Sequence, residues 1–234
     1  MYLEVFYEPT TLFSLKQSEA TNSGSKSLIS PSPYSIKMAL LNAIITFDSL
    51  TVAKEQFELI RDLNISFSLP QEIVVNNCFI KIMKDNDKET NKAIKELKPF
   101  KSTVAFREYV YLKSNISFAV EIKIKPNVKV LQDYDFLKKW FMHINYFGKK
   151  GCFFQFHGAE IKDYSALPIG YSSIWGKSFS NGIMFQLDDM SEENKFEDVN
   201  TYSDKKPKRE KKILVFPYKQ IESNKNYTLY RKFI

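Results

Sequence analysis

The chain has 234 residues, of which 44% are hydrophobic and 26% are charged, so it can bury a substantial core as a soluble globular protein. No apolar run approaches the roughly 20 residues that span a bilayer, and the first residues lack the cationic start of a signal peptide. The two cysteines, Cys78 and Cys152, are too few for a disulfide framework or a zinc site. We therefore exclude a membrane protein, a zinc finger and a disulfide-stabilised secreted protein, and expect a cytoplasmic location.

The net charge of +7 favours a polyanionic partner. The chain is also rich in Lys, Asn, Ile, Phe and Tyr, which A/T-rich codons supply, so genome composition alone can raise the charge. The placement of the basic residues is therefore more informative than their number.

The first third of the chain predicts a strand followed by helices. Residues 2–7 alternate as in an opening strand, and 8–33 form a long polar loop that ends in two prolines. Apolar residues then recur at helical spacing over 36–47, and 51–63 predicts a second helix.

The middle of the chain predicts strands and one further helix. A strand is expected over 73–83, a charged loop over 85–92, and a hairpin of 103–112 with 116–124 around the short turn at 113–115. Asp133 is a plausible cap for a helix that ends at Gly148, and a strand follows over 152–156. Short strands are also predicted over 182–187 and 213–218.

This order of elements indicates an α+β fold with helices on an antiparallel sheet. A ferredoxin-like (RRM-like) βαββαβ domain with long loop insertions fits best, over residues 1–157. Residues 158–234 are expected to form a small β-rich C-terminal extension with a charged, flexible insertion at about 188–212. The basic run 205–212 within it is interpreted as a solvated stretch of charge.

Several kinds of chemistry find no support in the sequence. The cysteines and histidines lack the paired spacings of zinc ligands, and neither a GxxxxGK[ST] nor a GxGxxG pattern occurs, so we expect no metal and no cofactor. His143 and His157 are the available general bases. With Tyr146 or Lys150 nearby, His157 leaves open a metal-independent cleavage of RNA, although spacing fixes no second catalytic group.

Two clusters suit an unpaired nucleic acid. The segment Tyr146-Phe147-Gly148-Lys149-Lys150-Gly151-Cys152 combines a glycine-bracketed turn, two lysines for phosphates and aromatic side chains on which bases can stack. In the strand Phe106-Arg107-Glu108-Tyr109, alternation puts Arg107 and Tyr109 on one face. The alternatives are a solvated helix-to-strand connection and an exposed Arg–Glu pair.

Three features together resemble the Cas-five subunits of CRISPR effector complexes, members of the RAMP superfamily. The first is Pro31-Ser32-Pro33-Tyr34-Ser35-Ile36-Lys37-Met38-Ala39-Leu40-Leu41, similar to that family's proline-rich start of its first helix. The second is Arg107-Glu108-Tyr109 in a mid-chain strand, and the third is the aromatic-Gly-Lys turn beginning at Tyr146. They occur in the family's order over about the first two-thirds of the chain.

The resemblance implies an RNA-binding subunit that caps and anchors the 5′ handle of crRNA in antiviral defence. Its implied partners are crRNA, the adjacent backbone (RAMP) subunits, target nucleic acid through the complex, and no membrane. The loop 85–98 is a plausible equivalent of the family's thumb, which leans on the neighbouring backbone subunit. The expected RNA-binding residues are Ser32, Tyr34, Lys37, Arg107, Tyr109, Tyr146, Gly148, Lys149, Lys150 and Gly151.

The chain departs from the family pattern in having few glycines and no mappable Tyr/Lys/His cleavage set. Both departures favour binding without catalysis. Two alternatives stay open: a metal-independent endoribonuclease that processes repeat RNA, and a basic protein-interaction module without RNA function.

Overall fold

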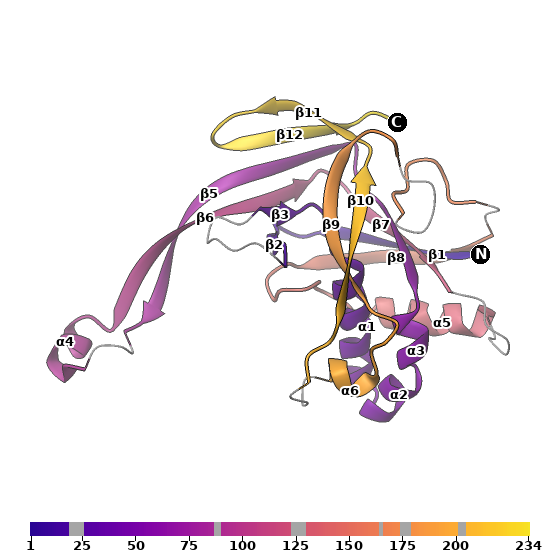
Figure 1. The fold of residues 1–234 in the computed structure, drawn as a ribbon, viewed down its shortest axis with the longest axis horizontal. Coiled ribbons are helices and arrows are strands. Elements are labelled where there is room, and N and C mark those ends of the chain that lie inside the picture. Colours follow the sequence, from indigo (N-terminus) through magenta and orange to yellow (C-terminus); the bar gives the residue numbers. More distant parts are fainter. Residues whose placement is uncertain (19–25, 87–89, 123–129, 164–165, 174–178, 201–204) are drawn as a thin grey trace.

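A computed structural model of the chain describes residues 1–18, 26–86, 90–122, 130–163, 166–173, 179–200 and 205–234. It is an α+β structure in which helices lie beneath antiparallel sheets and one long hairpin projects from the body (Figure 1). The α+β class expected from the sequence is confirmed.

The central sheet has the strand order β4-β7-β1-β8, with antiparallel pairing throughout. Its strands are β1 (Tyr2–Pro9), β4 (Asn64–Ser68), β7 (Ile116–Glu121) and β8 (Phe154–Lys162). In β1, the alternating residues Leu3, Val5 and Tyr7 are fully buried. Period-two patterning therefore turns one face of the sheet to the helices.

The helices pack beneath this sheet and close the core. They are α1 (Pro33–Phe47), α2 (Leu50–Glu55), α3 (Phe57–Arg61) and α5 (Val130–Phe141). Ser32 caps α1 by accepting a hydrogen bond from the Ser35 amide, and Pro33 occupies the first turn, where no amide hydrogen is needed. The Tyr7 hydroxyl donates to the Phe141 carbonyl at 2.6 Å, which ties the sheet to the end of α5.

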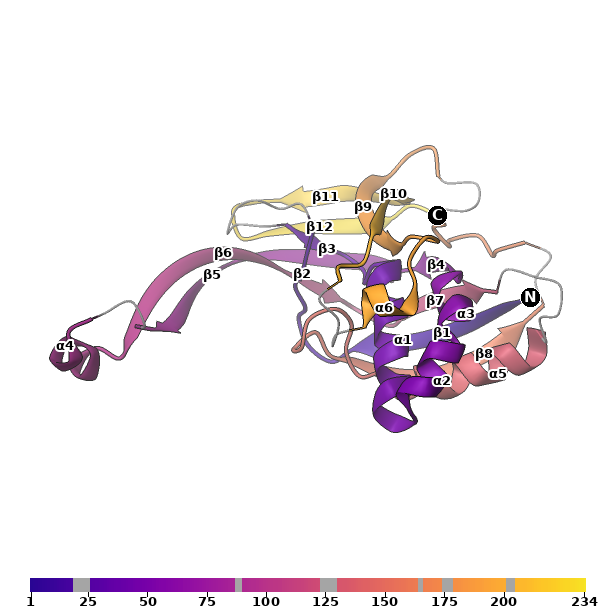
Figure 2. The same ribbon diagram turned by 60° about the horizontal axis from the view of Figure 1, so that its bottom comes forward.

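A second sheet, in the order β11-β12-β5-β6, carries the projecting hairpin. Its elements are β5 (Glu72–Asp85), α4 (Lys92–Leu97), β6 (Phe100–Leu112), β11 (Tyr218–Ser223) and β12 (Tyr227–Lys232). β12 pairs with β5 only as far as Asn76. Beyond that point β5 and β6 continue as a two-stranded arm (the described residues of 78–107), with α4 at its tip (Figure 2).

Five short elements complete the described fold. They are β2 (Leu15–Lys16), β3 (Ser27–Leu28), β9 (Ile183–Met190), α6 (Phe196–Val199) and β10 (Arg209–Phe216). Among them β9 packs on α1 and β3 on β6. β9 and β10 form a hairpin that crosses α1 (Figure 1).

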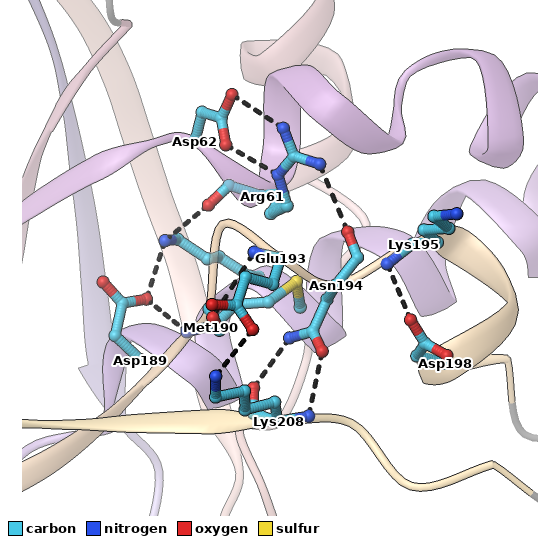
Figure 3. Close-up of polar contacts among 11 residues, drawn as sticks. Arg61, Asp62, Asp189, Met190, Glu193, Asn194, Lys195, Asp198 and Lys208 are labelled. Atoms are coloured by element: carbon cyan, nitrogen blue, oxygen red, sulfur yellow. Dashed lines mark hydrogen bonds and ion pairs between the residues drawn. The ribbon is translucent and has the colours of Figure 1, made fainter.

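A polar network holds the β9–β10 hairpin against the helices (Figure 3). Arg61 pairs with Asp62 and also donates to the Asn194 carbonyl, while the Asn194 side chain exchanges two hydrogen bonds with the Lys208 backbone. Asp189 lies at the inner end of the network and accepts from the Met190 amide and from the buried Lys37 ammonium.

Three expectations from the sequence are wrong. β6 and β7 do not form a hairpin: β6 pairs with β5, and β7 pairs with β1 and β4, because Ile116, Phe118 and Val120 are buried in the core. The helix before Gly148 ends at Phe141, since residues 142–153 form a separate bend. The second helix is broken at Gln56 into α2 and α3.

The C-terminal part also differs from expectation. The boundary placed between 157 and 158 falls within β8, which pairs with β1 over its whole length. The expected flexible insertion at 188–212 contains the end of β9, α6 and the start of β10 in its described residues. Its charges are compatible with order because carboxylates and cations of the segment pair with each other and with α1. Within the described ranges, no helix combines the length and apolarity that a membrane crossing requires.

Candidate nucleic-acid interface

A cavity of about 640 Å³ opens between α1, the Arg107 position of β6, the turn at 146–149 and the β9–β10 hairpin. Most of the predicted RNA-binding residues line it, namely Ser32, Tyr34, Arg107, Tyr146, Gly148 and Lys149. The glycine-bracketed bend (residues 146–152) and strand β6 with Arg107 are far apart in the sequence. Both therefore contribute to one concave surface.

The bend is a tight turn built on two glycines. Gly148 and Gly151 have φ values of 68° and 100°, in the left-handed region that glycine adopts at little cost. The Cys152 amide donates to the Lys149 carbonyl at 3.0 Å, which closes the turn. A Cβ on Gly148 would meet the Leu15 side chain at 3.2 Å, so glycine also lets the bend approach β2 closely. Lys149 is exposed at the cavity margin.

Helix α1 forms one wall through residues that recur at helical spacing, from Tyr34 to Thr46. The Ser32 hydroxyl is engaged as the N-terminal cap, so its acceptor capacity is partly used by the Ser35 amide. The amino-terminal end of α1 therefore borders the cavity, where the helix dipole favours an anion.

The opposite wall contains a cluster that sequence reasoning missed. The Arg209 guanidinium carbon lies 4.2 Å from the centre of the Tyr34 ring, and Arg209 pairs with Asp188 at 3.2 Å. The Ser18 hydroxyl donates to the other Asp188 oxygen. Burial raises the pKa of Tyr34, and the nearby Arg209 partly opposes that rise. The basic run 205–212 was the available signal for Arg209, although it was interpreted as solvated charge.

The cavity is electrostatically positive. Among the described residues, its lining includes the basic side chains of Lys16, Arg107, Lys149 and Arg209 and one carboxylate, that of Asp188. A protein binds a single-stranded nucleic acid through cations and hydrogen-bond donors, which contact the phosphates, and through aromatic rings, on which the bases stack.

Lys37 is not available to RNA, which corrects the expectation. Its side chain is 2% exposed, and the ammonium donates to Asp189 at 2.6 Å and to the Arg61 carbonyl at 2.8 Å. Helical periodicity explains the error, because Lys37 lies beside Ile36 on the buried side of α1, where an acidic residue from β9 meets it.

Tyr109, Lys150 and Gly151 are outside the cavity lining. Lys150 and Gly151 are exposed, while Tyr109 is half-buried opposite Asn76. Glu108, between Arg107 and Tyr109, accepts a hydrogen bond from the Ser27 amide at 2.7 Å. It therefore fixes β3 to β6, and the Arg-Glu-Tyr strand serves both packing and the cavity.

Neither histidine lines the cavity. His143 stacks on Phe47 with ring centres 4.7 Å apart, and His157 contacts Glu8 at 2.9 Å on the exposed face of β8. The two are thus held by separate partners on different elements.

One protein of similar sequence and two solved structures of similar fold carry CRISPR in their names. No protein-family model matches the chain. The CRISPR-associated protein Cas5 of Archaeoglobus fulgidus is 27% identical over 182 residues, which cover 75% of this chain and 73% of that protein.

Two solved structures share the fold. A CRISPR protein from Archaeoglobus fulgidus has a TM-score of 0.50 at 12% identity, covering 100% of this chain and 92% of its own. A chain of a CRISPR RNA-guided surveillance complex has a TM-score of 0.52 at 10% identity, covering 92% and 88%.

Proposed function

Because the chain is a homologue of a CRISPR-associated Cas5 protein, we propose that it is an RNA-binding subunit of a CRISPR effector complex. In this role it holds the 5′ handle of crRNA in the cavity between α1 and the bend. The observation that carries the proposal is the joint presence of Arg107 and Lys149 in one positive cavity.

The cavity chemistry matches a short single strand. Arg107, Lys149 and Arg209 meet phosphates, while Tyr34 and Tyr146 supply surfaces on which unpaired bases stack. The cavity volume of about 640 Å³ lies within the range of ligand-binding sites. The cavity also opens to solvent, so the end of an RNA strand can enter it.

The connectivity supports a ferredoxin-like core for this function. The elements β1, α1, β4, β7, α5 and β8 follow one another as βαββαβ, with α2 and α3 after α1 and the arm inserted between β4 and β7. The strand order β4-β7-β1-β8 is the one in which the first and third strands occupy the centre.

The arm is proposed as the contact with an adjacent backbone subunit. Phe79 and Phe106 face each other across the strands with ring centres 4.5 Å apart, and both are more than half exposed. Exposed apolar side chains continue along the same face to Met83, Val104 and Phe100. Lys81, Ser102 and Asp85 stand among them on this face. A cluster of exposed apolar side chains mixed with polar ones is typical of a protein interface.

The bend offers a matched pair of variants to test RNA binding. Lys149→Ala removes a cation from the cavity, whereas Lys150→Ala removes the same charge one residue away, outside the lining. We expect Lys149→Ala to weaken handle-RNA binding several-fold and to lower the salt slope by about 0.7, and Lys150→Ala to do less. Filter binding at several salt concentrations measures both, and equal effects of the two variants count against the cavity.

We also propose that the chain binds the handle without cleaving it, because neither histidine is among the cavity-lining residues. Incubation of the purified chain with repeat RNA in EDTA tests this. A single, reproducible cleavage position that is lost in His157→Ala would favour the endoribonuclease alternative.

A further inference from the structure

The positive cavity contains a negative charge that its proposed ligand does not need. Of the lining residues that the structure describes, Asp188 alone carries a carboxylate, and its side chain is 10% exposed. The Ser18 hydroxyl donates to Oδ1 at 2.9 Å, and the Arg209 Nη1 group donates to Oδ2 at 3.2 Å. A carboxylate removed from water needs such partners. Asp188 is therefore a fixed anion inside a site that suits phosphate.

Arg209 is the member of this pair that can move. Its side chain is long and 47% exposed, whereas the short Asp188 side chain is nearly buried and is also held by Ser18. An arginine binds carboxylate and phosphate through the same N–H donors. A phosphate in the cavity therefore competes with Asp188 for Arg209. The guanidinium lies 4.2 Å from the centre of the Tyr34 ring, so it covers that face of the ring until it moves.

The β9–β10 hairpin provides a second cation for Asp188 when Arg209 leaves. Lys211 is the register partner of Asp188, and Arg209 lies two residues earlier on β10, so all three side chains share one face. Opposite charges placed directly across two strands attract each other. Because the Lys211 ammonium and the Ser18 hydroxyl remain nearby, the departure of Arg209 does not leave an isolated buried charge.

We propose that Asp188 is an internal competitor for phosphate: it holds Arg209 over Tyr34 in the free protein, and a strand binds by taking Arg209 from it. The inference rests on the proposed function, because the strand is the RNA placed in the cavity. A single anion only exchanges one arginine contact for another. A strand also contacts Arg107 and Lys149, and these additional contacts offset the exchange. Asp188 thereby discriminates against isolated anions, as a competing element does in specific recognition.

The test compares Asp188→Asn with the control Glu193→Gln. Asparagine keeps an oxygen that accepts from Ser18, but its amide presents hydrogens to Arg209 in place of an acceptor. Glu193→Gln removes the same charge from the connection between β9 and β10, where Glu193 pairs with Lys208 at 2.6 Å outside the cavity lining. Filter binding measures the affinity of the full chain for handle RNA. The rise of Tm with added inorganic phosphate measures the binding of a single anion.

We expect Asp188→Asn to bind handle RNA about 3- to 10-fold more tightly than the wild type, because one competing ion pair is lost. The salt slope stays the same, since the number of phosphate contacts does not change. The dissociation constant for inorganic phosphate falls by a similar factor, whereas Glu193→Gln changes both affinities by less than about twofold. Asp188→Ser gives the same gain, and in the Arg209→Gln background Asp188→Asn gives none, because the competition acts through Arg209.

Unchanged or weaker RNA binding by Asp188→Asn would overturn the inference, since Asp188 would then support Arg209 instead of competing for it. Equal gains in Asp188→Asn and Glu193→Gln would overturn it too, because the change in net charge would explain both. If the wild-type chain does not bind handle RNA, the proposed function fails, and the phosphate measurement decides the inference alone. Greater stabilisation of Asp188→Asn than of the control by phosphate then supports it, and equal stabilisation refutes it.

Discussion

The buried pair of Lys37 and Asp189 gives the sharpest test of how α1 and β9 are held together. Both side chains are less than 5% exposed, and the ammonium makes a second hydrogen bond to the Arg61 carbonyl. Removing one member leaves a buried charge without its partner, which typically costs about 3 to 5 kcal/mol. This is a large part of the roughly 5 to 15 kcal/mol that stabilises a folded protein.

We therefore expect Lys37→Met to lower the free energy of unfolding by about 3 to 5 kcal/mol. Asp189→Asn, which keeps the acceptor for the Met190 amide, is expected to have a comparable cost. The double variant is expected to lose less than the sum of the two, with a coupling of up to about 3 kcal/mol. Urea unfolding followed by circular dichroism measures all three.

The exposed ion pair of Lys54 and Glu197 provides the control. Its N–O distance is 2.9 Å, yet Lys54 is 63% exposed, so Lys54→Met should change stability by less than about 1 kcal/mol. A Lys37→Met protein that keeps its stability but loses RNA binding would refute the reasoning, because Lys37 would then act at the surface.

Further predictions concern the β9–β10 hairpin and the C-terminal sheet. Gly182→Ala is expected to destabilise the protein by more than about 1 kcal/mol, because φ is 147° and a Cβ would collide with the Phe216 carbonyl oxygen; thermal unfolding measures this. Burial raises the pKa of Tyr218, so the stability it contributes is present below its unfolded pKa of about 10 and is lost as the pH rises beyond it. Tyr218→Phe should flatten that alkaline loss in unfolding curves, and an unchanged profile would contradict the assignment. Arg209→Gln should weaken RNA binding several-fold with a salt slope lower by about 0.7, whereas a slope equal to that of the wild type would remove Arg209 from the interface.

The sequence predicted those features that depend on local pattern. The amphipathic α1, the alternating β1 and the glycine-bracketed bend follow from periodicity and from glycine conformation, and the structure has all three. Strand pairing depends on distant residues: a short turn at 113–115 suggested a hairpin, but the buried side chains of β7 select β1 and β4 instead.

The same distinction explains the site residues. Arg107 and Lys149 were recognisable from charge beside aromatic and glycine residues, and the fold brings both to the cavity. Lys37 is equally basic, but its ammonium is buried and donates a hydrogen bond to Asp189, which lies 152 positions away in the sequence. Arg209 lies in a run of basic residues that does not distinguish it from its neighbours. The pairing of β10 with β9 brings it to the cavity.

Photo-crosslinking of handle RNA to the full chain tests the central claim most directly, because it maps the bound strand onto residues. With 4-thiouridine in the handle, the account predicts crosslinked peptides that contain Tyr34 and Tyr146, competed by unlabelled RNA and reduced in Lys149→Ala. Crosslinks confined to the exposed face of β8, with none in the peptides of Tyr34 and Tyr146, would contradict it.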